Sequence, residues 1–174
     1  MRAAARDFAQ TELLPGVIDR DNAQHFDPVL LRKMAEMGFL GMMVAPEYGG
    51  GGMDTLAYVL AMEEISKVDA SAGVIMSVNN SLVCWGLEKY GTEAQKHQYL
   101  TPLASGEIIG AFCLSEPEAG SDATSQHTTA RLTGDHYLLN GTKNWITNGN
   151  TSSVCVVMAQ TDVELKHKGI NAFI

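Results

Sequence analysis

The residues with the clearest capacity for chemistry lie in the stretch 112–122, which is Phe-Cys-Leu-Ser-Glu-Pro-Glu-Ala-Gly-Ser-Asp. An apolar run over 108–114 predicts a buried strand, and Pro117 ends it in a loop. This loop offers backbone N–H groups and two serine hydroxyls, and Gly120 permits close approach of a ligand to the backbone. The pattern indicates either a polar connection after a strand or a ligand-binding loop.

Other chemistries are poorly supported by the remaining polar residues. The five histidines show no ligand spacing with one another or with the cysteines, so the sequence predicts no metal site. Cys84, Cys113 and Cys155 each lie in an apolar run, which is typical of buried reduced thiols in a reducing compartment. The four glycines at 49–52 are not followed by Lys-Ser/Thr, so a tight surface connection is favoured over a phosphate-binding loop.

Composition narrows the classes of partner. With 174 residues, 45% of them hydrophobic, the chain can bury a core and form one or two small domains. Its formal net charge of −8 argues against nucleic acid and against an anionic membrane surface as partners. No run of eighteen apolar residues occurs, so no transmembrane helix is predicted. The first residues lack the apolar stretch of a secretory signal.

The elements that must position the 112–122 loop fall into two blocks. Residues 1–106 predict a helical domain, because capping signals and hydrophobic periodicity indicate helices over 3–14, 27–37, 54–66, 69–90 and 92–103. Residues 107–174 predict strands over 108–114, 128–132, 136–140, 145–147, 154–160 and 170–174. Helices followed by strands favour an α+β fold with two domains over a parallel βαβ sheet.

One polar interruption in the helix predicted over 69–90 leaves two interpretations open. Asn79, Asn80 and Ser81 break an otherwise apolar face, and an unpaired buried amide costs roughly 1–3 kcal/mol. These groups either pair with neighbouring helices or line a ligand cavity.

Two segments carry a resemblance to a known family. The 112–122 stretch closely resembles the flavin-binding signature of the acyl-CoA dehydrogenases, and Lys-Asn-Trp-Ile-Thr-Asn at 143–148 resembles that family's second flavin segment. The resemblance implies an N-terminal helical domain, a partial antiparallel β-barrel middle domain, and a C-terminal helical bundle that is absent from these 174 residues. It also implies a homotetramer, and a chain shortened at both ends.

The resemblance further implies which residues bind ligands. The expected cofactor is flavin adenine dinucleotide (FAD). Ser115 is expected at the pyrimidine end of the flavin, Trp145 packed on the ring system and Thr147 near N5. The full set expected to bind the cofactor is Phe112, Leu114, Ser115, Gly120, Ser121, Trp145, Ile146 and Thr147. The set expected to bind the substrate is Ser121, Asn79 and Leu82.

The implied activity is the α,β-dehydrogenation of an acyl-CoA thioester to a trans-2-enoyl-CoA in fatty acid β-oxidation. Hydride passes to flavin N5, and electrons pass on to electron-transfer flavoprotein. The catalytic glutamate of the family lies in the C-terminal domain, so no catalytic residue is expected within 1–174 and this chain alone is expected to be nearly inactive.

Substrate length and cellular location follow from weaker features. The segment 77–82, Ser-Val-Asn-Asn-Ser-Leu, is similar to short-chain members of the family and predicts a short-chain acyl-CoA. Location is expected to be cytoplasmic in a bacterium, or the mitochondrial matrix in a eukaryote. Two alternatives stay open: a flavin monooxygenase or oxidase of the same fold, and a non-catalytic acyl-CoA-binding module.

Overall fold

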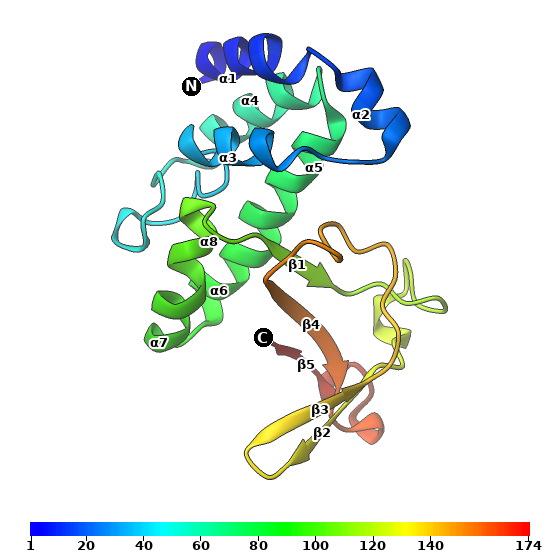
Figure 1. Ribbon diagram of the computed structural model, residues 1–174. Helices are drawn as coiled ribbons and strands as arrows, with labels where there is room; N and C mark the ends of the chain where they lie inside the picture. Colours follow the sequence, from blue (N-terminus) through cyan, green and yellow to red (C-terminus); the bar gives the residue numbers. More distant parts are fainter. The chain divides into compact units, whose positions relative to one another are not determined.

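A computed structural model describes all residues from 1 to 174, and the chain divides into two compact units. Met1–Ile109 is helical, whereas Gly110–Ile174 is built on a small sheet (Figure 1). The predicted α+β class is therefore confirmed.

The helices of the first unit follow capping signals in the sequence. Asp27, Asp54 and Asp69 each accept a hydrogen bond from a backbone N–H in the first turn of the helix that follows, at 2.8–3.0 Å. Thr92 and Gln95 form a reciprocal capping box. The helical segments are α1 Arg2–Phe8 with η1 Ala9–Leu13, α2 Val17–Ala23, α3 Pro28–Glu36, η2 Pro46–Tyr48, α4 Thr55–Ser66, α5 Ala70–Ser77 with η3 Val78–Cys84 and α6 Trp85–Tyr90, and α7 Glu93–Gln95 with η4 Lys96–Leu100 and α8 Thr101–Ser105.

One short helix was not predicted from the sequence. α2 buries none of its side chains, so it leaves no hydrophobic periodicity to detect. It begins after Gly16, whose φ of 72° lies in the left-handed region, and ends at Gln24 with a φ of 52°. Three longer helices contain a π-helical segment, namely η1, η3 and η4.

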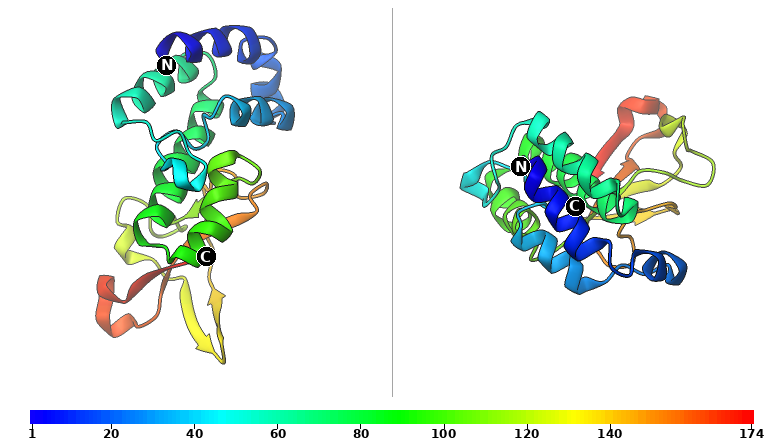
Figure 2. Two further views of the ribbon diagram at one scale, coloured as in Figure 1. Left: turned by 90° about the vertical axis from the view of Figure 1, so that its left-hand side faces the viewer. Right: turned by 90° about the horizontal axis from the view of Figure 1, so that it is seen from above.

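The core of the first unit joins α1 to α4 and α5. Phe8 packs edge-on against Phe39, with ring centroids 5.3 Å apart. Fully buried side chains of this core include Leu13, Met34, Leu40, Met42, Ile65 and Met76. Figure 2 shows the helices of this unit from two further directions.

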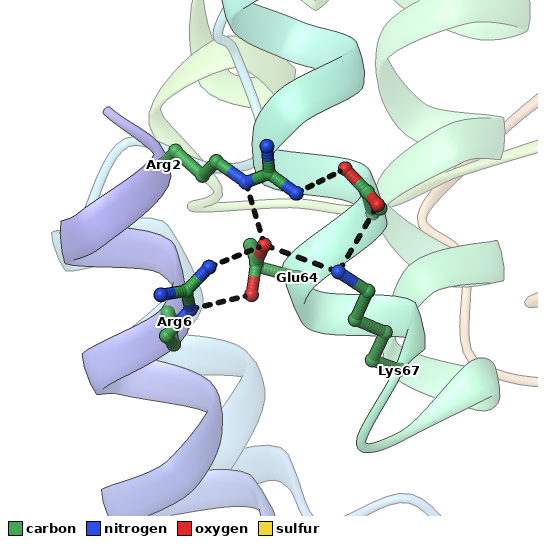
Figure 3. Close-up of polar contacts among 5 residues, drawn as sticks. Arg2, Arg6, Glu64 and Lys67 are labelled. Atoms are coloured by element: carbon green, nitrogen blue, oxygen red, sulfur yellow. Dashed lines mark hydrogen bonds and ion pairs between the residues drawn. The ribbon is translucent and has the colours of Figure 1, made fainter.

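A polar cluster fastens α1 to α4 beside this core (Figure 3). Glu64 is 4% exposed and accepts hydrogen bonds from Arg2, Arg6 and Lys67 at 2.7–3.2 Å. The pKa of its carboxyl lies far below the usual range, first because of the hydrogen bond from Arg6 and then because of the bond from Arg2.

The helix that contains Asn79 and Asn80 is held by their side-chain amides. The Asn79 amide nitrogen donates to the Leu40 carbonyl at 2.9 Å and to the Leu103 carbonyl at 3.1 Å. Asn80 accepts from the backbone N–H of Met42 at 2.8 Å. Both asparagines are buried, so these contacts support the interpretation in which they pair with neighbouring segments.

That same helix, Ala70–Tyr90, is long and apolar enough to cross a membrane by length and composition alone. This is weak support for a membrane span, because a buried core helix satisfies the same criteria. Its buried face, which includes Met76, Val83 and Leu87, and its hydrogen-bonded asparagines explain the composition by packing within the unit. The absence of a transmembrane helix stays a prediction.

The glycine run at 49–52 packs closely against the backbone of residues 41–44. Gly51 donates to the Gly41 carbonyl at 2.9 Å, and Gly52 donates to the Val44 carbonyl at 2.9 Å. A Cβ atom at Gly50 would lie 2.1 Å from the Val44 carbonyl oxygen. Glycine is therefore required for chain packing, in agreement with the tight connection that the sequence predicts.

The second unit contains five strands: β1 Gly110–Cys113, β2 Thr129–Thr133, β3 His136–Asn140, β4 Val154–Gln160 and β5 Ile170–Phe173. The order is β1-β4-β2-β3, and β5 also pairs with β4. Ala123–Ser125 (η5) and Val163–Gly169 (η6) are 3₁₀ segments.

Two expectations for this unit are corrected. The sheet is mixed, whereas a partial antiparallel barrel was predicted: β1 and β4 run parallel, with Phe112 opposite Val156. The long segment 114–153, which contains the β2–β3 hairpin, joins β1 to β4, so no tight turn between these two strands imposes an antiparallel direction. Residues 145–147 form no strand either, because Trp145 has a φ of 57° and turns the chain.

Candidate functional site

The two segments singled out in the sequence lie side by side in the second unit. The backbone N–H of Asn144 donates to the Ser115 carbonyl at 3.0 Å. One residue earlier, the ammonium of Lys143 donates to the Leu114 carbonyl at 2.9 Å. The end of β1 and the start of the 143–148 segment therefore form one continuous surface, although 29 residues separate Leu114 from Lys143.

The loop after β1 is ordered by its own backbone. Glu116 and Ala119 exchange two backbone hydrogen bonds, of 3.0 and 3.2 Å, so Pro117 and Glu118 occupy a tight turn. Gly120 and Ser121, which follow this turn, are exposed. A Cβ atom at Gly120 would meet nothing within 4 Å, so open space lies above the loop at this point.

A buried ion pair lies beneath this loop. Lys143 and Glu116 approach to 2.8 Å, and their side chains are only 10% and 3% exposed. Burial by itself raises the pKa of Glu116, but hydrogen bonds from Lys143 and Thr128 and from the backbone of His127 outweigh it and lower the pKa to about 2. Glu116 is therefore ionised at neutral pH.

Trp145 projects from the other segment. Its side chain is 91% exposed, the largest exposed fraction among the large hydrophobic residues, and its left-handed backbone directs the chain into the next turn. Asn148, with a φ of 65°, fixes the far end of this turn by donating from its side chain to the Gly110 carbonyl at 3.0 Å. Ile146 and Thr147 are half-buried between these two points.

Most of the residues predicted to bind the cofactor thus belong to two adjoining segments of the second unit. Phe112, Leu114 and Ser115 are half-buried on β1 and its extension, and Ile146 and Thr147 are half-buried on the second segment. Asn79 and Leu82 belong to the first unit, where Asn79 is fully buried and Leu82 is 40% exposed. Their expected role in substrate binding stays a prediction, and the amide contacts of Asn79 give it a structural role.

Three residues of this region received no role from the sequence. Lys143 and Asn144 belong to the second segment, and Gln126, which is 5% exposed, accepts a hydrogen bond from Lys143 at 2.9 Å. The Oδ1 atom of Asn144 is buried and has no hydrogen-bond partner within the chain. The available signal was one cation, Lys143, in the second segment and three acidic residues, Glu116, Glu118 and Asp122, in the first, and it does not identify which of them pair.

The region fits a flat aromatic ligand with polar edges. A buried, unpartnered carbonyl oxygen on Asn144 can accept a hydrogen bond, and the exposed indole of Trp145 can stack on a ring system. Half-buried hydroxyls of Ser115 and Thr147 lie in the same two segments. These are the groups that an isoalloxazine ring with its heteroatoms would use.

The cysteines and a surface cavity have no predicted role in ligand binding. Burial raises the pKa of Cys84 to about 12, and burial together with the neighbouring Cys155 raises the pKa of Cys113 to about 11, so both are thiols at neutral pH. A surface cavity of about 730 Å³ lies in the first unit, between α2 and the start of α5. None of the predicted site residues contributes to its wall.

Comparison with known families accounts for the whole sequence. Residues 1–107 match the family model described as "Acyl-CoA dehydrogenase, N-terminal domain", and residues 111–174 match "Acyl-CoA dehydrogenase, middle domain". Together the two matches cover nearly all of the chain, with an N-terminal domain followed by a middle domain, as the resemblance implies.

Individual relatives agree with these matches. The chain is 50% identical over 174 residues to the mitochondrial short-chain specific acyl-CoA dehydrogenase of Bos taurus, covering 100% of this chain and 42% of that protein. The structure of butyryl-CoA dehydrogenase from Megasphaera elsdenii superposes with a TM-score of 0.93 at 40% identity, over 99% of this chain and 46% of that one. A glutaryl-CoA dehydrogenase from Mycobacterium smegmatis in complex with FADH2 superposes with a TM-score of 0.92 at 38% identity, over 99% and 43%. The chain thus spans less than half the length of these relatives.

Proposed function

Because this chain belongs to the acyl-CoA dehydrogenase family, we propose that it supplies part of the flavin site of an enzyme that dehydrogenates a short-chain acyl-CoA to a trans-2-enoyl-CoA. The observation that carries the proposal is the union of the two flavin segments through Asn144 and Ser115, beside the exposed Trp145. The short-chain assignment is supported by the 50% identity to a short-chain specific relative.

Each side chain has a definite task in this proposal. Trp145 stacks on the isoalloxazine ring, and Thr147 directs its hydroxyl toward N5. Ser115 donates a hydrogen bond to the pyrimidine end, where negative charge gathers on reduction, and a donor aimed at developing charge is an effective way for a protein to favour reduction. Phe112, Leu114 and Ile146 border the ring with apolar contacts, while Gly120 and Ser121 serve the pyrophosphate and the CoA side of the substrate.

FAD is the cofactor of this proposal and would supply the hydride acceptor. The proposal assigns no proton-abstracting residue to this chain: Glu116 is already held by Lys143 and by two backbone N–H groups, so it has no free oxygen for such a role. A well-placed general base contributes about 10²–10⁴-fold to a rate, so we expect residues 1–174 alone to have little activity.

The wider assembly is proposed on family membership. Electron-transfer flavoprotein is the proposed electron acceptor. The proposed architecture of the complete enzyme is a homotetramer, with a middle β-barrel domain and a C-terminal helical bundle in each subunit. The cytoplasm of a bacterium or the mitochondrial matrix of a eukaryote is the proposed location.

The direct test is the absorbance spectrum of the complete purified enzyme that contains this chain, before and after anaerobic addition of butyryl-CoA. We expect flavin bands that bleach, or that give way to a long-wavelength charge-transfer band. A flavin spectrum that does not respond would remove the substrate assignment but leave the cofactor. Oxygen-dependent hydroxylation would favour the monooxygenase alternative. A protein that takes up no flavin would leave only an acyl-CoA-binding module.

A further inference from the structure

The buried cation of Lys143 joins three acceptors that lie far apart in the sequence. Its ammonium donates to the Leu114 carbonyl at 2.9 Å, to Glu116 at 2.8 Å and to Gln126 at 2.9 Å. A lysine ammonium has three hydrogens, so every donor is used within the protein. The side chain is therefore committed to this position and has no donor left for a ligand.

The carboxylate of Glu116 makes the complementary connection. One oxygen accepts from Lys143 and from the backbone N–H of Thr128, and the other accepts from the backbone N–H of His127. The pair thus joins the end of β1, the segment that begins at Lys143, and the two residues before β2. These three segments converge beneath the 115–122 loop.

We propose that the buried Lys143–Glu116 pair is the positioning device of the flavin site, which holds the first flavin segment in register with the second. The inference rests on the function proposed above. Lys143 donates to the Leu114 carbonyl, and the backbone N–H of Asn144 donates to the carbonyl of the next residue, Ser115. Because Trp145 directly follows Asn144, the pair determines how Ser115 faces Trp145.

Charge balance indicates that the pair acts through geometry. The two opposite charges are 2.8 Å apart and almost fully buried, so they cancel at the distance of a ligand above the loop. Burying two ions carries a large desolvation penalty, so the pair is poorly explained as a device for stability alone. Removal of one partner would leave the other charge buried and unpaired, and the backbone would move to hydrate it.

The test compares Lys143→Met with a matched control in the first unit. Arg20 is the control because its side chain is also buried, 15% exposed, and also combines a carboxylate, Asp69 at 3.1 Å, with the backbone carbonyls of Leu13 and Pro15. The Kd for FAD is measured by titration of the flavin-free protein well below the melting temperature. We expect Lys143→Met to raise this Kd by at least about tenfold and Arg20→Met to change it by less than about twofold, although both lower thermal stability.

A charge-neutral double variant separates geometry from charge. In Lys143→Met/Glu116→Gln no buried charge is left unpaired, so thermal stability should recover relative to Lys143→Met. The hydrogen bonds to the Leu114 carbonyl and from the Thr128 N–H, however, stay lost or weakened. We therefore expect its Kd for FAD to stay at least about fivefold above that of the wild type. The absorbance band of its bound flavin should also be shifted, which lower stability alone would not cause.

Several outcomes would overturn the inference. A Kd for FAD in Lys143→Met within twofold of the wild type would do so, and so would an equal loss of affinity in Arg20→Met. If Lys143→Met does not fold, Gln126→Met replaces it, because this variant removes one acceptor of Lys143 and leaves the ion pair. Gln126→Met is expected to raise the Kd for FAD about threefold, and an unchanged Kd would contradict the proposal. A wild-type protein that binds no FAD would overturn the proposed function as well.

Discussion

Trp145 illustrates how backbone conformation at one residue exposes a large apolar side chain. A left-handed φ is uncommon for a bulky residue and is strained relative to a helical or extended conformation. It carries the indole out of the protein, where it is 91% exposed and contributes little to packing. The proposed stacking on flavin would cover this exposed apolar surface.

Trp145→Ala should therefore reduce flavin affinity without unfolding the protein. We expect the Kd for FAD to rise at least about fivefold, since aromatic stacking contributes about 0.5–1.5 kcal/mol beyond area burial. The free energy of unfolding without flavin should change by no more than about 0.5 kcal/mol. Trp85→Ala is the control, because Trp85 is half-exposed in the first unit. Full flavin retention in Trp145→Ala would show that the indole does not stack on the ring.

Glu116 predicts a defined pH dependence. Its pKa in the folded protein, about 2, lies below the ordinary value of 4.5, so its ionised form stabilises the fold above pH 4.5 and that contribution is lost as the pH falls toward 2. Urea unfolding of the wild type and of Glu116→Gln should therefore differ most above pH 4.5, and the gap should close between pH 4.5 and 2. A gap independent of pH would contradict the ion pair.

At the scale of elements, two kinds of connection organise the chain. Helix caps act locally and define where α3, α4 and α5 begin. Polar clusters act over long distances: the Glu64 cluster holds α1 against α4, and the Lys143–Glu116 pair holds two loops to the start of β2. Removing a cluster should loosen one element while the others stay folded.

Glu64→Gln tests this at α1. The variant removes the charge that three cations share, so we expect faster hydrogen exchange of the α1 amides and a lower melting temperature. Glu63→Gln is the matched control, because Glu63 is the preceding residue and its side chain is 45% exposed. Its effect on α1 should be small. Equal protection of α1 in both variants would show that hydrophobic packing alone holds this helix.

Glycines in the long helix should respond to alanine in opposite directions. A Cβ atom at Gly86 meets nothing within 4 Å, so Gly86→Ala should stabilise the protein by about 0.5–1 kcal/mol through reduced entropy of the unfolded chain. At Gly73 the same atom would lie 2.1 Å from the Ser66 hydroxyl, so Gly73→Ala should destabilise by about 1–3 kcal/mol. Urea midpoints measure both, and a destabilised Gly86→Ala would contradict the open space at that position.

At the scale of the whole molecule, ligand binding should be linked to stability. The residues proposed to hold FAD are exposed or half-buried, so in the protein without flavin their side chains have surface left for contacts with a ligand. A ligand that binds only the folded state stabilises it by an amount set by its concentration relative to the Kd.

Free FAD at a hundredfold excess over its Kd should stabilise the folded protein by about 2.7 kcal/mol. The melting temperature should therefore rise with FAD concentration, and Trp145→Ala should require more FAD for the same rise. A wild-type melting temperature that does not depend on FAD would contradict a preformed site.

The sequence alone determined the features that depend on neighbouring residues. Cap residues, the order of helices and then strands, and the two flavin segments are local patterns, because each arises from side chains within a few positions of one another. The α+β class and the family followed from them. The sequence did not reveal α2, since a helix that buries no side chain has no periodic apolar face.

Only the tertiary structure decided how distant segments meet. The parallel pairing of β1 with β4 and the left-handed turn at Trp145 replace a predicted antiparallel barrel and a predicted strand. The partnership of Lys143 with Glu116 is likewise invisible in either segment alone. The physical reason is the same in each case: strand direction, backbone conformation at a turn and the pairing of buried charges are fixed by contacts between residues far apart in sequence, where they outweigh local preference.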